Sequence, residues 1–167
     1  AIMLSQIGGP HFPVCVKTIA VDYSKRFPDP ILKVVPADID RFEGALAPLT
    51  KKGGWAVLYN PAIKSSGRVN YTLGHELGHY FAHRNLVPTG FQCGQNDVLG
   101  SAAKAAYQQR EREADDFSSY ILMPLDDFRK QVGDAPMTLD LLRHLADRYD
   151  VSLTAAALKW LEATEQC

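Results

Sequence analysis

Two histidines stand four residues apart in the segment His75-Glu76-Leu77-Gly78-His79, with a glutamate directly after the first. Residues at positions i and i+4 lie on one face of an α-helix, with Cβ atoms about 5–6 Å apart. On such a helix both imidazoles can reach one metal ion at the Zn–N distance of about 2.0–2.1 Å. Glu76 would then point beside the ion, where a carboxylate can take a proton from an activated water. The chain must therefore build a helix here and fold around it.

The flanking residues support a buried helix. Gly74 and Gly78 each disfavour a helix by about 1 kcal/mol relative to alanine, so we expect another backbone to approach closely at these positions. A polar turn over residues 64–67 predicts that the helix begins near Asn70 or Thr72. The apolar side chains beside the histidines are Leu73, Leu77, Tyr80 and Phe81. Because three fixed residues in five also occur by chance, the alternative is a structural histidine pair in the core.

A catalytic zinc ion takes three protein ligands and keeps one open position. The sequence predicts a second helix over residues 110–124, with apolar residues at helical spacing and Pro124 at its end. Glu111 and Asp115 share one face of this helix. We expect Glu111 to be the third ligand and Asp115 to accept the free ring N–H of a ligand histidine. Glu113 is the alternative ligand, rotated about 200° from Glu111.

Other assignments for these residues remain open. The run of charged residues at 110–116 also fits an ordinary solvated helix face. His83 lies one turn beyond His79, but eight residues of helix carry it about 12 Å from His75, so we expect it to pack or form hydrogen bonds. Cys93, in a segment that reads as a loop, could also approach the metal, and the alternative for it is a free cysteine with no role.

Composition fits one enzyme-sized domain. The chain has 167 residues, of which 46% are hydrophobic and 22% charged, so we expect a single domain over residues 1–167. A net charge of −1 gives no basic excess for nucleic-acid binding. No apolar run is long enough for a membrane span, and no signal peptide is indicated, so we expect a cytoplasmic protein with a protein partner. Three widely spaced cysteines predict neither a disulfide framework nor a cysteine zinc site.

The order of elements predicts an α+β fold with the metal-site helix in its core. We expect a small, mainly antiparallel sheet packed on helices, with a polar turn at residues 51–54 joining its last two strands. The expected parts are an N-terminal helix within 1–30 (Phe12 to Phe27), a sheet within 31–62 (strands 32–35, 42–46 and 55–60), two metal-site helices and a loop (85–104) within 68–124, and a helical pair within 136–163.

Two of these elements carry functional alternatives. The strand Trp55 to Asn60 is our candidate for a sheet edge that pairs with an extended substrate, although a central position is equally compatible with its sequence. The helices at 138–149 and 152–163, joined by a tight turn, also resemble a DNA-binding pair. The second of them offers only Thr154, Lys159 and Trp160 for a groove of DNA, so we expect this pair to pack on the core or to dock a partner.

Together the motifs resemble those of the ImmA/IrrE metallopeptidases. The resemblance comprises three stretches: residues 73–79 with His83, residues 111–124, and residues 145–158 in the helical tail. It covers about residues 40 to 163. It implies a zincin-like domain that cuts a helix-turn-helix transcriptional repressor, often the product of a neighbouring gene, and so releases stress, DNA-damage or mobile-element genes.

The expected function is a zinc-dependent endopeptidase in which Glu76 is the catalytic base. Ligand sets of this type also accept manganese, cobalt or iron. The alternative is a non-catalytic metal-binding module that sequesters a partner protein, as an anti-repressor or antitoxin does. Glu76 favours catalysis, because a purely structural metal site needs no base. The candidates for stabilising the oxyanion are Tyr71, Tyr80, Tyr107 and His83.

Overall fold

The computed structural model describes residues 11–38, 42–92 and 101–165. Its four-stranded sheet has the order β1-β3-β2-β4. The strands are β1 (Ile31–Pro36), β2 (Gly44–Leu49), β3 (Gly54–Tyr59) and β4 (Phe91–Gln92). β1 pairs with β3 in parallel, whereas β2 is antiparallel to both β3 and β4. The predicted α+β fold with a small, mainly antiparallel sheet is confirmed.

The interpretation of residues 55–60 as a sheet edge is wrong. β3 lies in the centre of the sheet, because β1 pairs along one side of it and β2 along the other. The hairpin between β2 and β3 turns where expected, with Gly53 at a φ of +66°. On the other side of β2, β4 pairs only with Ala45 and Leu46 among the described residues. The edge nearest the metal-site helix therefore belongs to β2 and β4.

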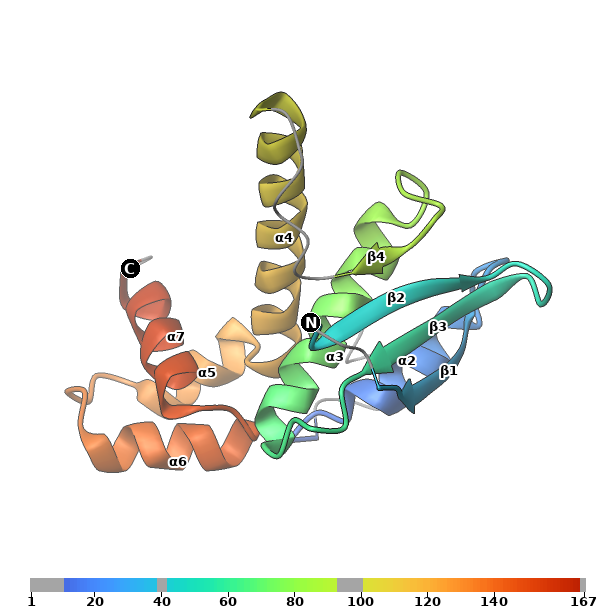
Figure 1. The fold of residues 1–167 in the computed structure, drawn as a ribbon. Helices are drawn as coiled ribbons and strands as arrows, with labels where there is room; N and C mark the ends of the chain where they lie inside the picture. The colour runs from blue at the N-terminus through green and yellow to red at the C-terminus, as the bar shows by residue number, and fades with distance from the viewer. Residues whose placement is uncertain (1–10, 39–41, 93–100, 166–167) are drawn as a thin grey trace.

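Helices lie along one side of the sheet, and the C-terminal helices extend beyond it (Figure 1). They are α2 (Val16–Ser24), α3 (Ser66–His83), α4 (Ser101–Leu122), α5 (Leu125–Val132), α6 (Leu139–Tyr149) and α7 (Leu153–Glu165). Helix α3 lies between the sheet and α4, and it packs on β2, β3 and α2 as well. The metal-site helix is therefore in the core, as the sequence predicts. None of the described helices is both long and apolar enough to cross a bilayer.

Several boundaries differ from the sequence-based expectation. Helix α3 begins at Ser66 rather than near Asn70, because the Ser65 hydroxyl accepts a hydrogen bond from the Arg68 backbone N–H and caps the helix. Helix α2 is shorter than expected, α4 begins earlier at Ser101, and α5 was not expected. Residues 93–100 of the expected loop lie outside the described residues, as does the candidate ligand Cys93.

The close approach expected at the two glycines of α3 is confirmed. A Cβ atom on Gly74 would lie 2.5 Å from the Ser118 hydroxyl, and one on Gly78 would lie 2.9 Å from the Ala114 Cα. Ser118 donates a hydrogen bond to the Tyr71 carbonyl across the same contact. Small residues thus allow α3 and α4 to pack backbone against side chain, which brings their functional faces together.

A hydroxyl side chain caps each helix of the C-terminal pair. The Thr138 side chain accepts from the Leu141 N–H, and Ser152 accepts from the Ala155 N–H. Between the helices, Asp150 adopts a left-handed conformation with a φ of 49°. The two tryptophans occupy different ends of the fold: Trp55 in β3 donates to the Asp29 carboxylate, and Trp160 is buried on α7.

Candidate metal centre

Three side chains from α3 and α4 converge on one point. His75, His79 and Glu111 each offer a ligand atom, and these atoms lie within 4.8 Å of one another. The two Nε2 atoms are 3.0 Å apart, and each lies 3.4 Å from an oxygen of Glu111. Two ligand atoms at about 2.0–2.1 Å from a tetrahedral zinc ion would lie about 3.4 Å apart. The donor set and its spacing fit a zinc ion with one position left for substrate or water.

Glu111, not Glu113, faces the histidines. Glu113 points to the other side of α4, where its carboxylate contacts His83 Nε2 at 2.8 Å. The difference follows from the helical geometry, because two residues along an α-helix turn the side chain by about 200°. His83 is fully buried and does not join the ligand group. It takes part in hydrogen bonds instead, as the distance along α3 predicts.

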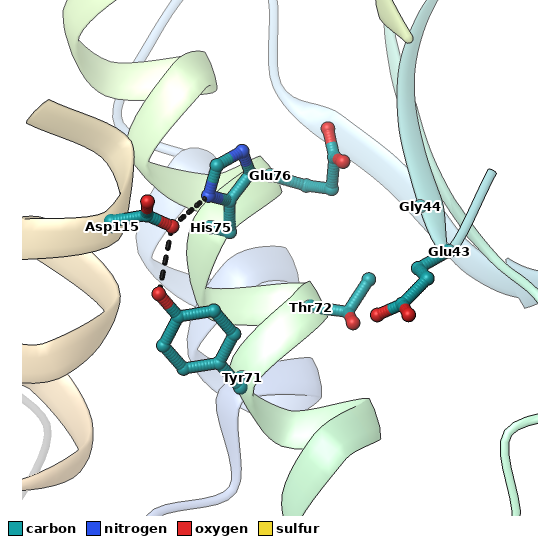
Figure 2. A pocket seen from close by; sticks show the side chains of 7 residues that line it. All are labelled: Glu43, Gly44, Tyr71, Thr72, His75, Glu76 and Asp115. Carbon is teal, nitrogen blue, oxygen red and sulfur yellow. Dashed lines mark hydrogen bonds and ion pairs between the residues drawn. The ribbon is translucent and has the colours of Figure 1, made fainter. Parts of the chain in front are cut away.

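Each histidine of the group has a partner at its second ring nitrogen. His75 Nδ1 lies 2.8 Å from the Asp115 carboxylate, which also accepts a hydrogen bond of 2.7 Å from the Tyr71 hydroxyl (Figure 2). His79 Nδ1 lies 3.1 Å from His83 Nδ1. With both Nδ1 atoms engaged, both Nε2 atoms are directed toward Glu111. Such contacts fix the tautomer and the orientation of a metal-binding imidazole.

The electrostatics of the group favour a cation. Burial opposes protonation of His75, but hydrogen bonds with Asp115 and Glu111 raise the pKa of this histidine to about 9. Burial likewise opposes ionisation of Glu111, yet its contacts with the two imidazoles lower the pKa of its carboxyl group to about 2. Burial lowers the pKa of His79 below its ordinary value. The carboxylates thus hold a positive charge at a point where two imidazole nitrogens meet, which is also the position a divalent cation would occupy.

Glu76 lies beside this group, at a small pocket. The pocket, called the site pocket below, has a volume of about 210 Å³. Its lining residues are Glu43, Gly44, Tyr71, Thr72, His75, Glu76 and Asp115. The Glu76 side chain extends from α3 toward β2, away from Asp115 across the His75 ring (Figure 2). A carboxylate in this place can exchange a proton with a molecule held at the open side of the ligand group.

Gly44 is a site residue that the sequence analysis did not identify. A Cβ atom at this position would lie 2.8 Å from Glu76 Oε1 and 2.5 Å from Thr72 Cγ2. Only glycine therefore leaves room for the Glu76 carboxylate against the start of β2. An isolated glycine in a strand does signal close approach, but the sequence does not say which side chain approaches.

The candidates for stabilising an oxyanion differ in their distance from the site pocket and in their hydrogen-bond partners. Tyr71 lines the site pocket, and burial together with its bond to Asp115 raises the pKa of its hydroxyl, which therefore stays protonated. The Tyr80 hydroxyl donates instead to the Asp29 carbonyl, at the far end of α3 from the pocket. His83 is engaged by His79 and Glu113. Of the four candidates, which include Tyr107 on α4, Tyr71 alone lines the site pocket.

The sequence matches the description "IrrE N-terminal-like domain" of peptidase family M78 over residues 29–161. The chain belongs to this family. Comparison of the IrrE-like chain with curated proteins gives no match. The matched region includes the sheet, both helices of the candidate metal centre, α6 and most of α7, so the family assignment covers every element that builds the site.

Proposed function

We propose that this IrrE-like chain is a zinc-dependent endopeptidase that hydrolyses a peptide bond in a protein substrate. The observation that carries the proposal is the convergence of three metal-ligand atoms beside a buried glutamate at an open pocket. Membership of a peptidase family supports the same reaction. His75, His79 and Glu111 would hold the ion, with manganese or another divalent metal as a possible replacement.

A bound zinc ion supplies Lewis acidity, which polarises a carbonyl and makes a water more acidic. Glu76 acts as the base: it takes one proton from the attacking water as the new C–O bond forms. The same carboxyl group then gives the proton to the amide nitrogen, and the C–N bond breaks to leave a free amine and a carboxylic acid, which keeps the second proton of the water until it ionises. Asp115 and His83 hold the two imidazoles in orientation, and the Tyr71 hydroxyl, at the wall of the pocket, donates to the Asp115 carboxylate.

The substrate that we propose is a helix-turn-helix transcriptional repressor in the cytoplasm, as the resemblance to ImmA/IrrE metallopeptidases implies. The proposal includes no direct binding of nucleic acid. The low net charge of the chain supports a protein partner over DNA. Cleavage of a repressor would place the chain in stress or mobile-element regulation.

The decisive experiment compares the native protein with Glu76→Gln, which keeps the size of the side chain and removes its basicity. Metal content is measured in both, and each is incubated with the helix-turn-helix repressor encoded beside its gene. We expect equal metal content and cleavage by the native protein only. If both proteins bind the repressor and both leave it whole, the sequestering module is supported instead.

A further inference from the structure

A second hollow adjoins the site pocket on the side of the C-terminal helical pair. This side groove has a volume of about 520 Å³, within the range of about 300–1,000 Å³ typical of ligand sites. Helix α3 contributes Arg68 and Tyr71 to its lining, and α7 contributes Ala155 and Leu158. Glu43 and Tyr71 line both hollows, so the side groove continues the site pocket toward α7.

The α7 wall of the groove is held firmly in place. Asp150, in the turn before α7, accepts hydrogen bonds from Ser66 at 2.7 Å and from Asn70 at 3.2 Å, both on α3. Lys159 of α7 is buried; its ammonium group lies 3.3 Å from the Ser119 hydroxyl and 3.7 Å from the centre of the Tyr120 ring, both on α4. The groove is therefore formed before any ligand arrives, which reduces the entropic cost of binding.

The chemistry of the lining differs between its two sides. Val151, Ala155 and Leu158 form the apolar part of the α7 wall, beside the uncharged Ser152 and Thr154, and Leu158 is 63% exposed. On the opposite side the Arg68 guanidinium is paired with the Glu43 carboxylate, so the charges there are already matched within the protein. An uncharged chain segment with a large aliphatic side chain fits this combination, because it covers Leu158 without displacing an ion pair.

We propose that the side groove binds the part of the substrate polypeptide next to the scissile bond, with a large aliphatic side chain against Leu158. This inference depends on the proposed function, because the occupant is defined by its connection to a bond held in the site pocket. The C-terminal helical pair then selects the substrate by forming one wall of its binding cleft.

The test uses a mixture of peptides from a whole-proteome digest, incubated with the zinc-loaded chain and analysed for cleavage sites by mass spectrometry. The native chain should favour leucine, isoleucine, valine or methionine at one position near the cut. Leu158→Gln should weaken that preference on the order of 10-fold, the scale of discrimination by an apolar pocket. Leu161→Gln, on the same helix, equally long and 47% exposed but outside the groove lining, should retain the native preference.

The outcomes separate this inference from the proposed function. If Glu76→Gln abolishes cleavage but Leu158→Gln keeps the native cleavage profile, the groove does not bind the substrate and the inference is wrong, while the peptidase stands. If the native zinc-loaded chain cuts no peptide, both the proposed function and this inference are contradicted. Because Leu158 is exposed, a thermal melt should show both leucine variants folded like the native chain.

Discussion

At the residue scale, the two site histidines differ in the number of residues that hold their rings by hydrogen bonds, one for His75 and two in series for His79. His75 is held by Asp115, a half-exposed carboxylate on α4. The support of His79 runs through a second imidazole, from His79 Nδ1 to His83 and from His83 Nε2 to Glu113. With metal on its Nε2, His79 carries its proton on Nδ1 and donates it to His83. His83 then donates from Nε2 to Glu113, so one direction of donation satisfies every ring nitrogen in the series.

We expect His83→Phe to weaken zinc binding by about 10- to 100-fold, the usual effect of losing the partner of a ligand histidine. Phenylalanine keeps a ring in the buried space beside Phe91 but cannot accept the His79 proton. Zinc affinity measured by competition with a chromophoric chelator checks this. Glu113→Gln serves as the control: Glu113 is half exposed, so water can replace it and the loss should be smaller. Unchanged affinity in His83→Phe would show that His79 needs no such support.

Gly44→Ala should lower peptidase activity while leaving metal binding intact. The added methyl group would lie 2.8 Å from Glu76 Oε1 and so push the carboxylate out of place. A positioned proton-transfer group contributes about 10²–10⁴-fold to a rate, and we expect a loss of about 10- to 100-fold in kcat. Metal content, measured in parallel, should match that of the native chain, since the three atoms nearest to the methyl group belong to Thr72 and Glu76 and not to a ligand residue. Full activity would exclude the proposed steric role of this glycine.

At the scale of elements, the contact between α3 and α4 sets the geometry of the metal centre. It joins the helix that carries both histidines to the helix that carries Glu111 and Asp115. A small displacement between these helices would separate Glu111 from the imidazoles, because their ligand atoms are only 3.4 Å apart. The close approach of the two helices at Gly74 and Gly78 is therefore part of what sets the spacing of the ligand atoms.

Gly78→Ala tests this contact. In an isolated helix the change would stabilise by about 0.5–1 kcal/mol, but here the new Cβ atom would meet the Ala114 backbone at 2.9 Å. We expect a net loss of about 1–3 kcal/mol in the free energy of unfolding, as for other overpacked cores, together with weaker metal binding. Urea unfolding of the metal-depleted chain measures the first effect. A variant more stable than the native chain would contradict the close packing.

Local patterns in the sequence predict where a helix or strand lies better than they predict which other elements pack against it. The spacing of His75 and His79 predicted α3, and the one-turn pair Glu111 and Asp115 predicted the face of α4 that meets it. The position of β3 was not predictable in this way, because it depends on a parallel partner, β1, that no local turn specifies. Gly44 was missed for the same reason: its requirement arises from Glu76, on another element.

At the scale of the whole molecule, an ion pair joins α5 to α6 and makes stability depend on pH. Arg148 donates two hydrogen bonds, of 2.9 and 3.0 Å, to the Asp127 carboxylate, and the Tyr149 hydroxyl donates one of 2.6 Å. Burial raises the pKa of Asp127, but these donors outweigh it and hold the pKa below the ordinary value of about 3.9. The carboxylate therefore stabilises the fold above about pH 4, and this contribution is lost as the pH falls through its folded pKa.

Asp127→Asn should cost about 1.5–3 kcal/mol at pH 7, the range for a hydrogen bond to a charged group. The difference between the native chain and the variant should shrink as the pH falls below about 4, first because Asp127 of the unfolded chain takes up a proton and then because the folded carboxyl group does. Urea unfolding at pH 7 and pH 3 gives the two differences. Equal differences at pH 7 and pH 3 would show that the ionised form of Asp127 contributes nothing to the fold.

The two tryptophans lie in different parts of the fold, so their intrinsic fluorescence can report on the unfolding of each part. Trp55 senses the sheet and Trp160 senses the C-terminal pair, and the sequence has no third indole to mix the signals. Replacing either one with phenylalanine would leave a fluorophore at one end of the fold. Coincident emission changes during denaturation would show that the sheet and the helical pair unfold as one cooperative unit. Separate midpoints would show that the α7 wall of the side groove unfolds independently of the sheet.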